Sequence, residues 1–269
     1  MFTQQQHKNC IYMVSDKISA RHMFTTRLGG VSGGVWASWN FGENRGDDPE
    51  NVRENYRLAG EIFGCTENDF VVTKQVHEKT VIIAADKDRH TLGTQTPYTA
   101  DGLVTKERGL PLMIYIADCV PVLLHDENAG VIGAVHCGWK SSVADILGVA
   151  VDNMIKLGAR AEDIHAAIGA SIGKCCFECD DDVPEAVTRY LGGETDGLFE
   201  KKPNGKTHVD LRRANERRLL QLGLKPENID VSSECTMCRQ DKYWSHRGTN
   251  GVRGSMAAVI MLDLKDKLL

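Results

Sequence analysis

Cys119 and His136, whose side chains can bind a metal or exchange a proton, lie near the two ends of one largely apolar segment, Ala117–Lys140. Its sequence DENAG, at Asp126–Gly130, is typical of a turn between two strands. If this turn forms, Cys119 lies opposite His136 or Cys137, and facing residues of antiparallel strands have Cβ atoms about 5 Å apart. At that distance a thiolate and an imidazole can share a metal ion or a proton. Either residue alone would indicate a buried structural side chain, but the two together, beside Asp-Cys and Cys-Gly-Trp sequences, favour a functional site.

A third group would decide between metal binding and nucleophilic catalysis, and His77 in KQVHEKTV is the best candidate. Two imidazoles and one thiolate form a catalytic zinc set that leaves a fourth position open for water. Spacing alone leaves two interpretations of His77 open: a metal ligand, or a strand-end histidine hydrogen-bonded to the backbone. In the alternative function, a metal-free cysteine hydrolase acts on an acyl or amide substrate, with Cys119 as nucleophile and His136 as base. Replacing His77 would spare that activity, whereas it would abolish the activity of a zinc enzyme.

The segments that must position these groups alternate between helix-like and strand-like patterns. Helices are expected at residues 47–64, 141–158, 181–192 and 209–223, each ending in glycine. Strands are expected within residues 69–84, around His77, and at 101–105, 110–117, 120–125, 131–136 and 256–262. We therefore expect an α/β (α+β) fold, a single layered domain over residues 1–269 with mixed or antiparallel sheets flanked by helices.

Composition excludes several classes of protein. The 269 residues carry a formal net charge of -5 with interspersed signs, which argues against nucleic-acid binding. Charged residues interrupt every long apolar run, so no membrane span is expected, and the first residues lack the pattern of a signal peptide. Nine cysteines without such a signal predict a cytoplasmic protein with reduced thiols. The sequence specifies no protein partner.

Seven motifs occur in the order and approximate spacing of one family. They are KQVH, DGLVT, ADCVPVLL, AVHCGWK, AIGASIGKCCFE, VDL with a following Asn and Leu, and CTMC followed by YWSHR. On these motifs the chain resembles the YfiH-type laccase-domain family, also described as multifunctional purine nucleoside phosphorylases and formerly as polyphenol oxidases. The resemblance runs from Phe24 to Leu262, nearly the whole chain.

The resemblance implies a metal site and an activity. The family's zinc ligands correspond here to His77, Cys119 and His136. Members of the family look like enzymes that cleave adenosine, inosine, guanosine and methylthioadenosine with phosphate and that deaminate adenosine. Zinc is the expected metal rather than copper, because one Cys and two His make a single mononuclear set and not a multicopper relay. The implied fold is a layered α/β arrangement related to a cysteine-hydrolase group of bacterial toxins.

Deamination requires a proton carrier besides the metal. Asp118 and Asp101 are the acidic candidates near the motifs. Neighbouring strand residues point to opposite faces, so Asp118 reaches the same side as Cys119 only if the backbone departs from a regular strand. The catalytic groups we expect are Cys119, His136 and Asp118.

Phosphorolysis instead requires phosphate to be held against the anomeric carbon while positive charge develops on the ribose. Cationic side chains and backbone N–H groups serve this purpose. The candidates for substrate and phosphate binding are Arg27, Lys140, Arg247 and His246, and the glycine-rich loop Gly29–Gly34 could form a cradle.

The anion-binding positions depart from the family pattern. Lys140 stands where the family has Arg, and lysine cannot reproduce a bidentate guanidinium contact. Near the C-terminus Arg247 remains, but the next family Arg is Gly248 and a later one is displaced or lost at Ser255. Arg253 could compensate from a shifted position. The predicted metal ligands are thus intact while the predicted phosphate site is altered.

Five further cysteines are grouped in two short sequences. Cys176-Phe-Glu-Cys179 and Cys235-Thr-Met-Cys238 look like the two halves of a structural zinc site, with Cys175 as a fifth thiol. Their wide separation favours packed free thiols over a second metal, since cysteine is readily buried as a small apolar side chain.

Overall fold

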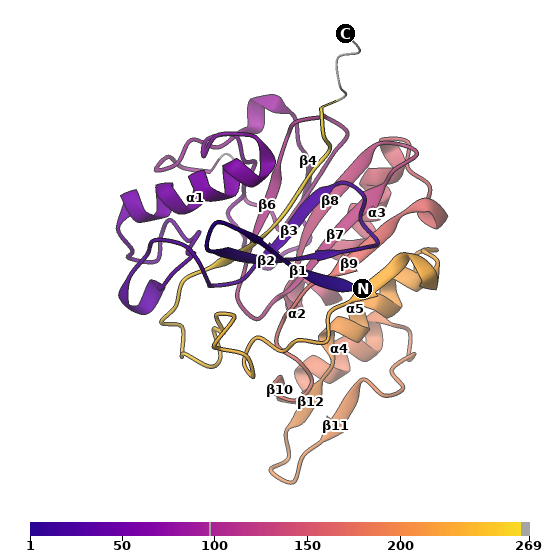
Figure 1. The fold of residues 1–269 in the computed structure, drawn as a ribbon. Helices are drawn as coiled ribbons and strands as arrows, with labels where there is room; N and C mark the ends of the chain where they lie inside the picture. Colours follow the sequence, from indigo (N-terminus) through magenta and orange to yellow (C-terminus); the bar gives the residue numbers. More distant parts are fainter. Residues whose placement is uncertain (97, 265–269) are drawn as a thin grey trace.

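The chain builds three sheets, and each of the two larger ones joins strands that are far apart in sequence (Figure 1). The computed structural model describes residues 1–96 and 98–264. The helices are α1 (Pro49–Phe63), α2 (Trp139–Val143), α3 (Ile146–Lys156), α4 (Asp182–Tyr190) and α5 (Leu211–Gln221). The strands are β1 (Phe2–His7), β2 (Cys10–Ser15), β3 (Arg21–Thr25), β4 (Val81–Ile83), β5 (Gly102–Thr105), β6 (Leu112–Ile116), β7 (Val120–Asp126), β8 (Val131–Cys137), β9 (His165–Ile168), β10 (Glu178–Cys179), β11 (Phe199–Lys201), β12 (Thr207–Val209), β13 (Ile229–Val231) and β14 (Met256–Met261).

The two larger sheets contain antiparallel and mixed pairings. One has the order β1-β2-β3-β14-β6 and is antiparallel throughout. The other has the order β13-β9-β7-β8-β5-β4, with parallel pairs at its two edges and antiparallel pairs between them. A small antiparallel sheet, β10-β12-β11, projects at the bottom of Figure 1. The prediction of an α/β fold with mixed and antiparallel sheets flanked by helices is confirmed.

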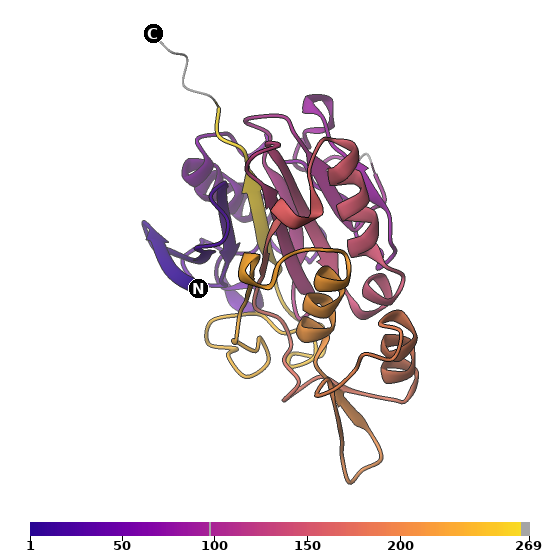
Figure 2. The same ribbon diagram turned by 90° about the vertical axis from the view of Figure 1, so that its right-hand side faces the viewer.

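The two larger sheets pack face to face, and helices cover their outer faces (Figure 2). Strand β14 illustrates this packing. Its residues are all buried, and their side chains point alternately into two different cores. Ala258 and Ile260 face the core between the sheets, while Ala257 and Val259 face the core beneath α1. Side chains that alternate in this way across a sheet with both faces covered make a nearly continuous apolar strand.

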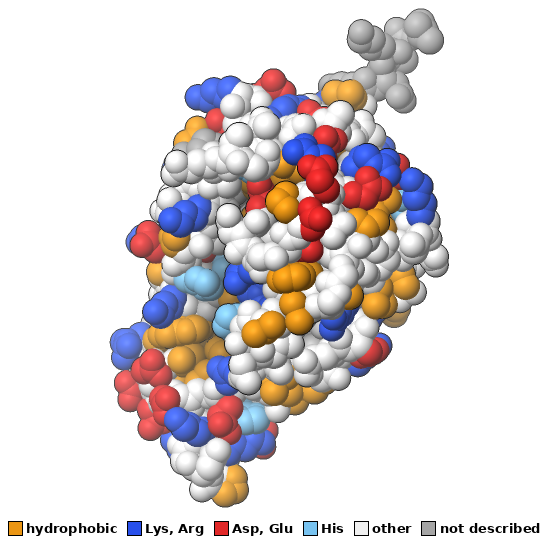
Figure 3. Space-filling model, turned by 90° about the vertical axis from the view of Figure 1, so that its left-hand side faces the viewer, with side chains coloured by type: hydrophobic (Ala, Val, Ile, Leu, Met, Phe, Trp, Pro, Cys, Tyr) orange, Lys and Arg blue, Asp and Glu red, His pale blue; other side chains and the backbone are white. Residues whose placement is uncertain are grey.

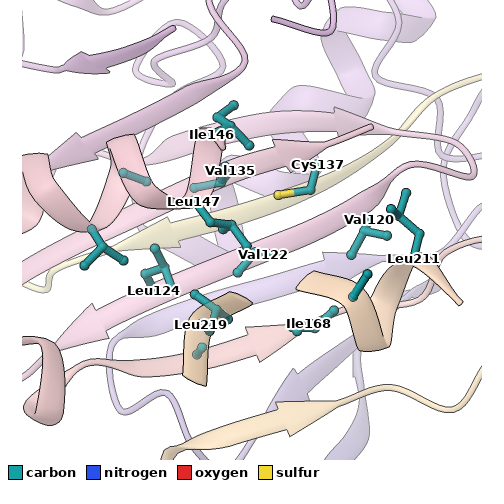
Figure 4. Close-up of a cluster of buried hydrophobic side chains, with 14 of the residues drawn as sticks. Val120, Val122, Leu124, Val135, Cys137, Ile146, Leu147, Ile168, Leu211 and Leu219 are labelled. Carbon is teal, nitrogen blue, oxygen red and sulfur yellow. The ribbon is translucent and has the colours of Figure 1, made fainter. Parts of the chain in front are cut away.

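The outer face of the six-stranded sheet lies under α3 and α5 and carries the largest apolar cluster (Figure 4). Val120, Val122 and Leu124 of β7 contribute to it from alternate positions. Helix side chains such as Ile146, Leu147 and Leu219 complete the cluster. The hairpin β7–β8 is thereby fixed on both faces, so its open end is a rigid support for side chains.

Helix α1 confirms the expected helix at 47–64 together with its ends. The Asp48 side chain accepts a hydrogen bond from the backbone N–H of Glu50, and Gly64 closes the helix with φ 69°. A residue without Cβ adopts this left-handed conformation readily, which makes glycine a favourable helix end.

The prediction of one helix over 141–158 is wrong, because α2 ends at Val143 and α3 begins at Ile146. Between them Asp145 has φ 70°, and its side chain accepts a hydrogen bond from the backbone N–H of Gly148. A capping residue in this conformation interrupts the helix.

Two other differences concern strands. Within residues 69–84 only Val81–Ile83 forms a named strand, and His77 lies in a bend. The strands β1 to β3 and β9 to β13 have no counterpart among the predicted strands. Within residues 1–96 and 98–264 no helix combines the length and the apolar character needed to cross a membrane.

Candidate functional site

The open end of the β7–β8 hairpin is the starting point of the site. Asp126 pairs with Val131 and Val120 with Cys137, so the loop consists of residues 127–130. Cys119 precedes β7 and by the same register stands across from Gly138, one residue beyond the predicted position. The predicted hairpin is confirmed, and its predicted register was wrong by one residue.

His77, Cys119 and His136 come together at this open end. One donor atom from each lies within 4.8 Å of the other two. The Sγ atom of Cys119 is 3.6 Å from Nε2 of His77, and the two imidazole rings have centroids 5.0 Å apart. The three side chains are exposed, half-buried and buried, respectively. Such a set can hold one metal ion while leaving a coordination position directed to solvent.

Asp101, which is fully buried just before β5, holds two of these three residues. Its Oδ1 accepts hydrogen bonds from Nδ1 of His136 and from the backbone N–H of His77, both at 2.9 Å. Its Oδ2 accepts from the N–H groups of Val76 and Glu78 at 3.0 and 2.9 Å. The bend thus formed places His77 at φ 64°, a conformation that non-glycine residues rarely adopt. Asp101 therefore positions one ligand through its ring and the other through its backbone.

Gly138 provides the space that His77 occupies. Its φ of -66° is open to any residue, so the requirement is steric. A Cβ atom at this position would lie 2.5 Å from Cδ2 of His77 and 3.3 Å from Sγ of Cys119. A side chain at this position would displace His77 or Cys119, so the glycine after the His-Cys pair leaves room for the three donors to meet.

Substituting alanine for Gly138 tests this packing. We expect Gly138→Ala to displace the His77 ring and to lower metal affinity by about 10–100-fold, the usual effect of disturbing a ligand's support. The matched control is Gly33→Ala, since Gly33 has no positive φ and a Cβ there would meet no atom within 4 Å. Competition with a chromogenic zinc chelator measures both variants, and equal affinities would contradict the steric role of Gly138.

The electrostatics of the site favour a thiolate. Burial raises the pKa of Cys119, but the positive charge of His136 and hydrogen bonds from His136 and His77 outweigh it, so the pKa is lowered. Burial also raises the pKa of Asp101, and the hydrogen bonds from His136, Glu78 and Val76 reverse this effect and lower it. A thiolate beside an oriented imidazole is suited both to metal binding and to nucleophilic attack.

Asp118 also leaves the regular strand, with φ 78°. Its carboxylate accepts hydrogen bonds from Oγ1 of Thr236 at 2.6 Å, Oγ of Ser245 at 3.0 Å and the backbone N–H of Arg247 at 2.7 Å. It therefore joins the start of β7 to the C-terminal loop that lines the site. Its role as a proton carrier stays a prediction.

The three donors open into a cavity of about 790 Å³. Histidine and basic side chains lie beside one another on the face of the molecule shown in Figure 3. The apolar lining of the cavity includes Ile172 and Phe177, whose ring lies beneath the guanidinium of Arg247, and Tyr115 and Thr73 also line it. A cavity of this size holds a small organic ligand. The residues that line it are Gly42, Glu43, Asn44, Arg45, Thr73, Lys74, Gln75, His77, Gly93, Thr94, Gln95, Thr96, Tyr115, Ile116, Ala117, Asp118, Cys119, His136, Ile172, Phe177, His246, Arg247, Arg253 and Ser255.

Of the predicted anion-binding groups, the structure brings His246 and Arg247 to the cavity. Arg27 lies elsewhere: its guanidinium donates to the carbonyl oxygens of Ala37 and Gln240 and stacks on Trp244. The loop Gly29–Gly34 and Lys140 also lie outside the cavity lining. Lys140 is exposed and stands over the ring of Trp139.

Arg253 differs from the other cations of the cavity in its burial. It is only 9% exposed, and it lines the cavity. Its Nη1 donates to the carbonyl oxygen of Gly254 and to Oγ of Ser255, and its Nη2 donates to Nδ1 of His246 at 3.5 Å, while Nε has no hydrogen-bond partner within the described residues. No carboxylate forms an ion pair with it in that part of the chain. A buried guanidinium without an acidic partner is costly, which indicates an anionic ligand.

Comparison with known proteins assigns the chain to a family. Residues 21–263 match the family described as multi-copper polyphenol oxidoreductase laccase. The chain belongs to this family. The resemblance deduced from the seven motifs is thereby confirmed.

Several named relatives align over most of the chain. A purine nucleoside phosphorylase of Deinococcus radiodurans is 39% identical over 251 residues, 93% of this chain and 92% of the relative. The purine nucleoside phosphorylase YlmD of Geobacillus stearothermophilus is 35% identical over 245 residues, 88% of each chain. The adenosine deaminase RL5, from an unknown prokaryotic organism, is 32% identical over 229 residues, 83% of this chain and 87% of the relative.

Two solved structures share the fold of this chain. YlmD from Geobacillus stearothermophilus has a TM-score of 0.92 at 31% identity, covering 98% of this chain and 99% of that one. YfiH of Bacillus licheniformis has a TM-score of 0.91 at 30% identity, covering 97% and 99%.

One basic residue that lines the cavity was not predicted from the sequence. Arg45 is exposed, lines the cavity and lies close enough to lower the pKa of Arg253. The only signal in the sequence is the short polar stretch Asn44-Arg45-Gly46, in which Gly46 has φ 84°. This stretch is typical of a turn, and nothing local connects it to His77.

Proposed function

We propose that this chain is a zinc-dependent purine nucleoside enzyme. Its reactions are the phosphorolysis of adenosine, inosine, guanosine and methylthioadenosine to the free base and ribose 1-phosphate or methylthioribose 1-phosphate, and the deamination of adenosine to inosine. The observation that carries the proposal is a Cys-His-His donor set opening into a cavity that also receives a buried, unpaired arginine. Relatives named purine nucleoside phosphorylase and adenosine deaminase support it.

The donor set fits zinc. His77, Cys119 and His136 would hold the ion, and their chemistry matches that of catalytic zinc sites with one open position. Zinc bound there supplies Lewis-acid chemistry toward water or a substrate oxygen. Copper remains the less favoured metal, since within the described residues the only other metal-binding group consists of four cysteines, which is not the histidine-rich arrangement of a multicopper relay.

Different lining residues of the cavity bind the two substrates of phosphorolysis, the phosphate and the nucleoside. Arg253, Arg45 and Arg247 hold the phosphate, because guanidinium groups form paired, charge-assisted hydrogen bonds to its oxygens. Phe177 and Ile172 offer an apolar surface for the purine. These residues together hold the phosphate against the anomeric carbon of the nucleoside. The bond from this carbon to the base is then replaced by a bond to phosphate while both substrates stay bound.

Removal of the metal tests the proposal. After dialysis against a strong chelator, we expect the rate of nucleoside consumption in the presence of phosphate to fall by at least about 100-fold. This loss exceeds the usual effect of removing a single residue that hydrogen-bonds to a metal ligand. Added zinc restores the rate in the parent protein and leaves His77→Ala inactive. His7→Ala, which removes a histidine of strand β1, is the control. A chelated protein with an undiminished rate would contradict the proposal.

One observation favours the alternative, a metal-free cysteine hydrolase. Cys119, His136 and Asp101 stand in the order of nucleophile, base and orienting carboxylate, with Nδ1 of His136 bonded to Asp101 at 2.9 Å. Such an enzyme agrees with the implied relationship of the fold to cysteine-hydrolase toxins. Turnover of acyl or amide substrates that persists in chelator and in His77→Ala, but not in Cys119→Ser, would establish it.

A further inference from the structure

Four cysteines form a second cluster that the proposed function does not use. Cys175 and Cys176 precede β10, and Cys235 and Cys238 follow β13. Their Sγ atoms all lie within 4.8 Å of one another, with Cys238 at 3.5 Å from Cys175 and 3.4 Å from Cys176. With Zn–S bonds of about 2.3 Å, tetrahedral coordination places sulfur atoms about 3.8 Å apart. The four thiols are thus spaced as a zinc ion would require.

Apolar burial does not account for this cluster. Cys175 and Cys238 are exposed and Cys176 is half-buried, so only Cys235 lies in the core. Cys179, which the sequence pattern groups with Cys176, lies apart from them, with its Sγ directed at the carbonyl oxygen of Phe177. The expectation of packed free thiols therefore fits Cys179 and not the four clustered residues.

Backbone contacts hold the two cysteine loops together. Ser171 and Cys235 form a parallel bridge, and the N–H of Thr236 donates to the carbonyl oxygen of Ser171 at 3.0 Å. The N–H of Gly173 donates to Sγ of Cys235 at 3.2 Å and orients that sulfur. A Cβ on Gly173 would lie 3.2 Å from Cβ of Cys235 and 3.3 Å from Sγ of Cys175, so glycine permits this approach. The loops are preformed around the four sulfur atoms.

A buried cation stands beside the cluster. Arg212 is 8% exposed, and one of its Nη atoms would lie 2.9 Å from a Cβ on Gly173. The other donates to the carbonyl oxygens of Ser232 and Glu234, and no carboxylate pairs with Arg212 within the described residues. Four thiolates around Zn²⁺ carry a net charge of -2, and a buried guanidinium nearby would offset part of it.

From these contacts we propose that Cys175, Cys176, Cys235 and Cys238 bind a structural zinc ion, separate from the candidate catalytic metal. Binding releases the thiol protons and fills all four coordination positions with sulfur, so the ion has no position open for substrate. It ties the segment that carries Ile172 and Phe177 to the loop that carries His246 and Arg247, and these four residues line the cavity. The ion therefore stabilises one wall of the cavity without taking part in the chemistry.

Elemental analysis of desalted protein, purified with zinc and reductant, tests the site. We expect two zinc ions per chain, one for each group of donors, and one in His77→Ala. A Cys175→Ser, Cys238→Ser double variant should lose one zinc and unfold at a lower temperature, whereas Cys179→Ser should keep both. Cobalt bound to His77→Ala should show the intense thiolate-to-metal absorption of a four-sulfur tetrahedral site, a measurement that requires no folded double variant.

Two results would overturn the proposal. One is a His77→Ala protein that retains no metal and whose four thiols react freely with a thiol reagent in the folded state. The other is a protein whose mass, measured in reducing buffer, is two hydrogen atoms below that of the fully reduced chain, which would place a disulfide among these cysteines. Both results are independent of nucleoside turnover, so they leave the proposed function untouched.

Discussion

Replacement of Asp101 by alanine is expected to lower metal affinity by at least about 100-fold and to remove nucleoside turnover with it. The reason is that one carboxylate supports two ligands. It accepts the ring N–H of His136, and it accepts the backbone N–H groups that hold His77 in its left-handed bend. Loss of both supports leaves Cys119 as the only ligand in its original place.

The isosteric variant and a matched control make this prediction specific. Asp101→Asn preserves volume and keeps one acceptor oxygen, but its amide directs N–H groups at two of the four N–H donors, so we expect a smaller loss than in Asp101→Ala. Asp126 is also a buried carboxylate that accepts backbone hydrogen bonds, from Ala129 and Arg160, at the opposite end of the same hairpin. Asp126→Ala should destabilise the fold yet retain metal affinity. Equal affinities of Asp101→Ala and Asp126→Ala in chelator competition would refute the positioning role.

Replacement of Arg253 by methionine is expected to raise KM for phosphate by about 100-fold or more, with a smaller loss of unfolding free energy than Arg27→Met causes. A charge-assisted hydrogen bond contributes about 1.5–3 kcal/mol, so the loss of a bidentate pair reaches this range. Burial and the charge of Arg45 lower the pKa of Arg253 to about 10, which still leaves it protonated at neutral pH. An unpaired buried charge opposes folding, and an apolar side chain of similar length removes that cost.

Arg27→Met provides the contrast, because the structure places Arg27 outside the cavity lining. Its three hydrogen bonds to carbonyl oxygens hold the loop near Ala37, so we expect lower stability and an unchanged KM for phosphate. Steady-state kinetics with varied phosphate and urea unfolding of both variants measure the two effects. A phosphate KM that rises in Arg27→Met and not in Arg253→Met would reverse the assignment.

Local patterns in the sequence predicted the parts of the site that belong to one hairpin. The turn signal and the two apolar runs identified β7 and β8, and with them the meeting of Cys119 and His136. The register was wrong by one residue because it depends on loop length, and the sequence DENAG permits loops of different length.

Contacts between distant segments were not available from such patterns. Spacing could not decide whether His77 reaches the hairpin, since its place depends on a bend held by Asp101, 24 residues away. Motif comparison with a family supplied that contact, and the structure supplied the physical reason for it. Asp101 itself was predicted only as a possible proton carrier, because its hydrogen bonds to the bend are visible only in three dimensions.

The two cysteine groups illustrate the same limit. Cys176 and Cys179 are three residues apart, a spacing that indicates a pair of ligands, but Cys179 belongs to the short strand Glu178–Cys179 whereas Cys176 lies in the loop before it. Cys179 thereby turns away, and Cys175 takes its place beside the C-terminal loop. Spacing identified the right loops, and local backbone conformation selected the thiols.

The reaction that we propose for this site is transfer of the sugar of a purine nucleoside to phosphate. Its most direct test is chromatographic identification of the products when the zinc-loaded protein is mixed with adenosine, with and without phosphate. We expect adenine and ribose 1-phosphate only when phosphate is present, together with inosine formed in either case. Adenosine that remains unchanged in both mixtures, while the protein holds its metal, would contradict the proposed reaction.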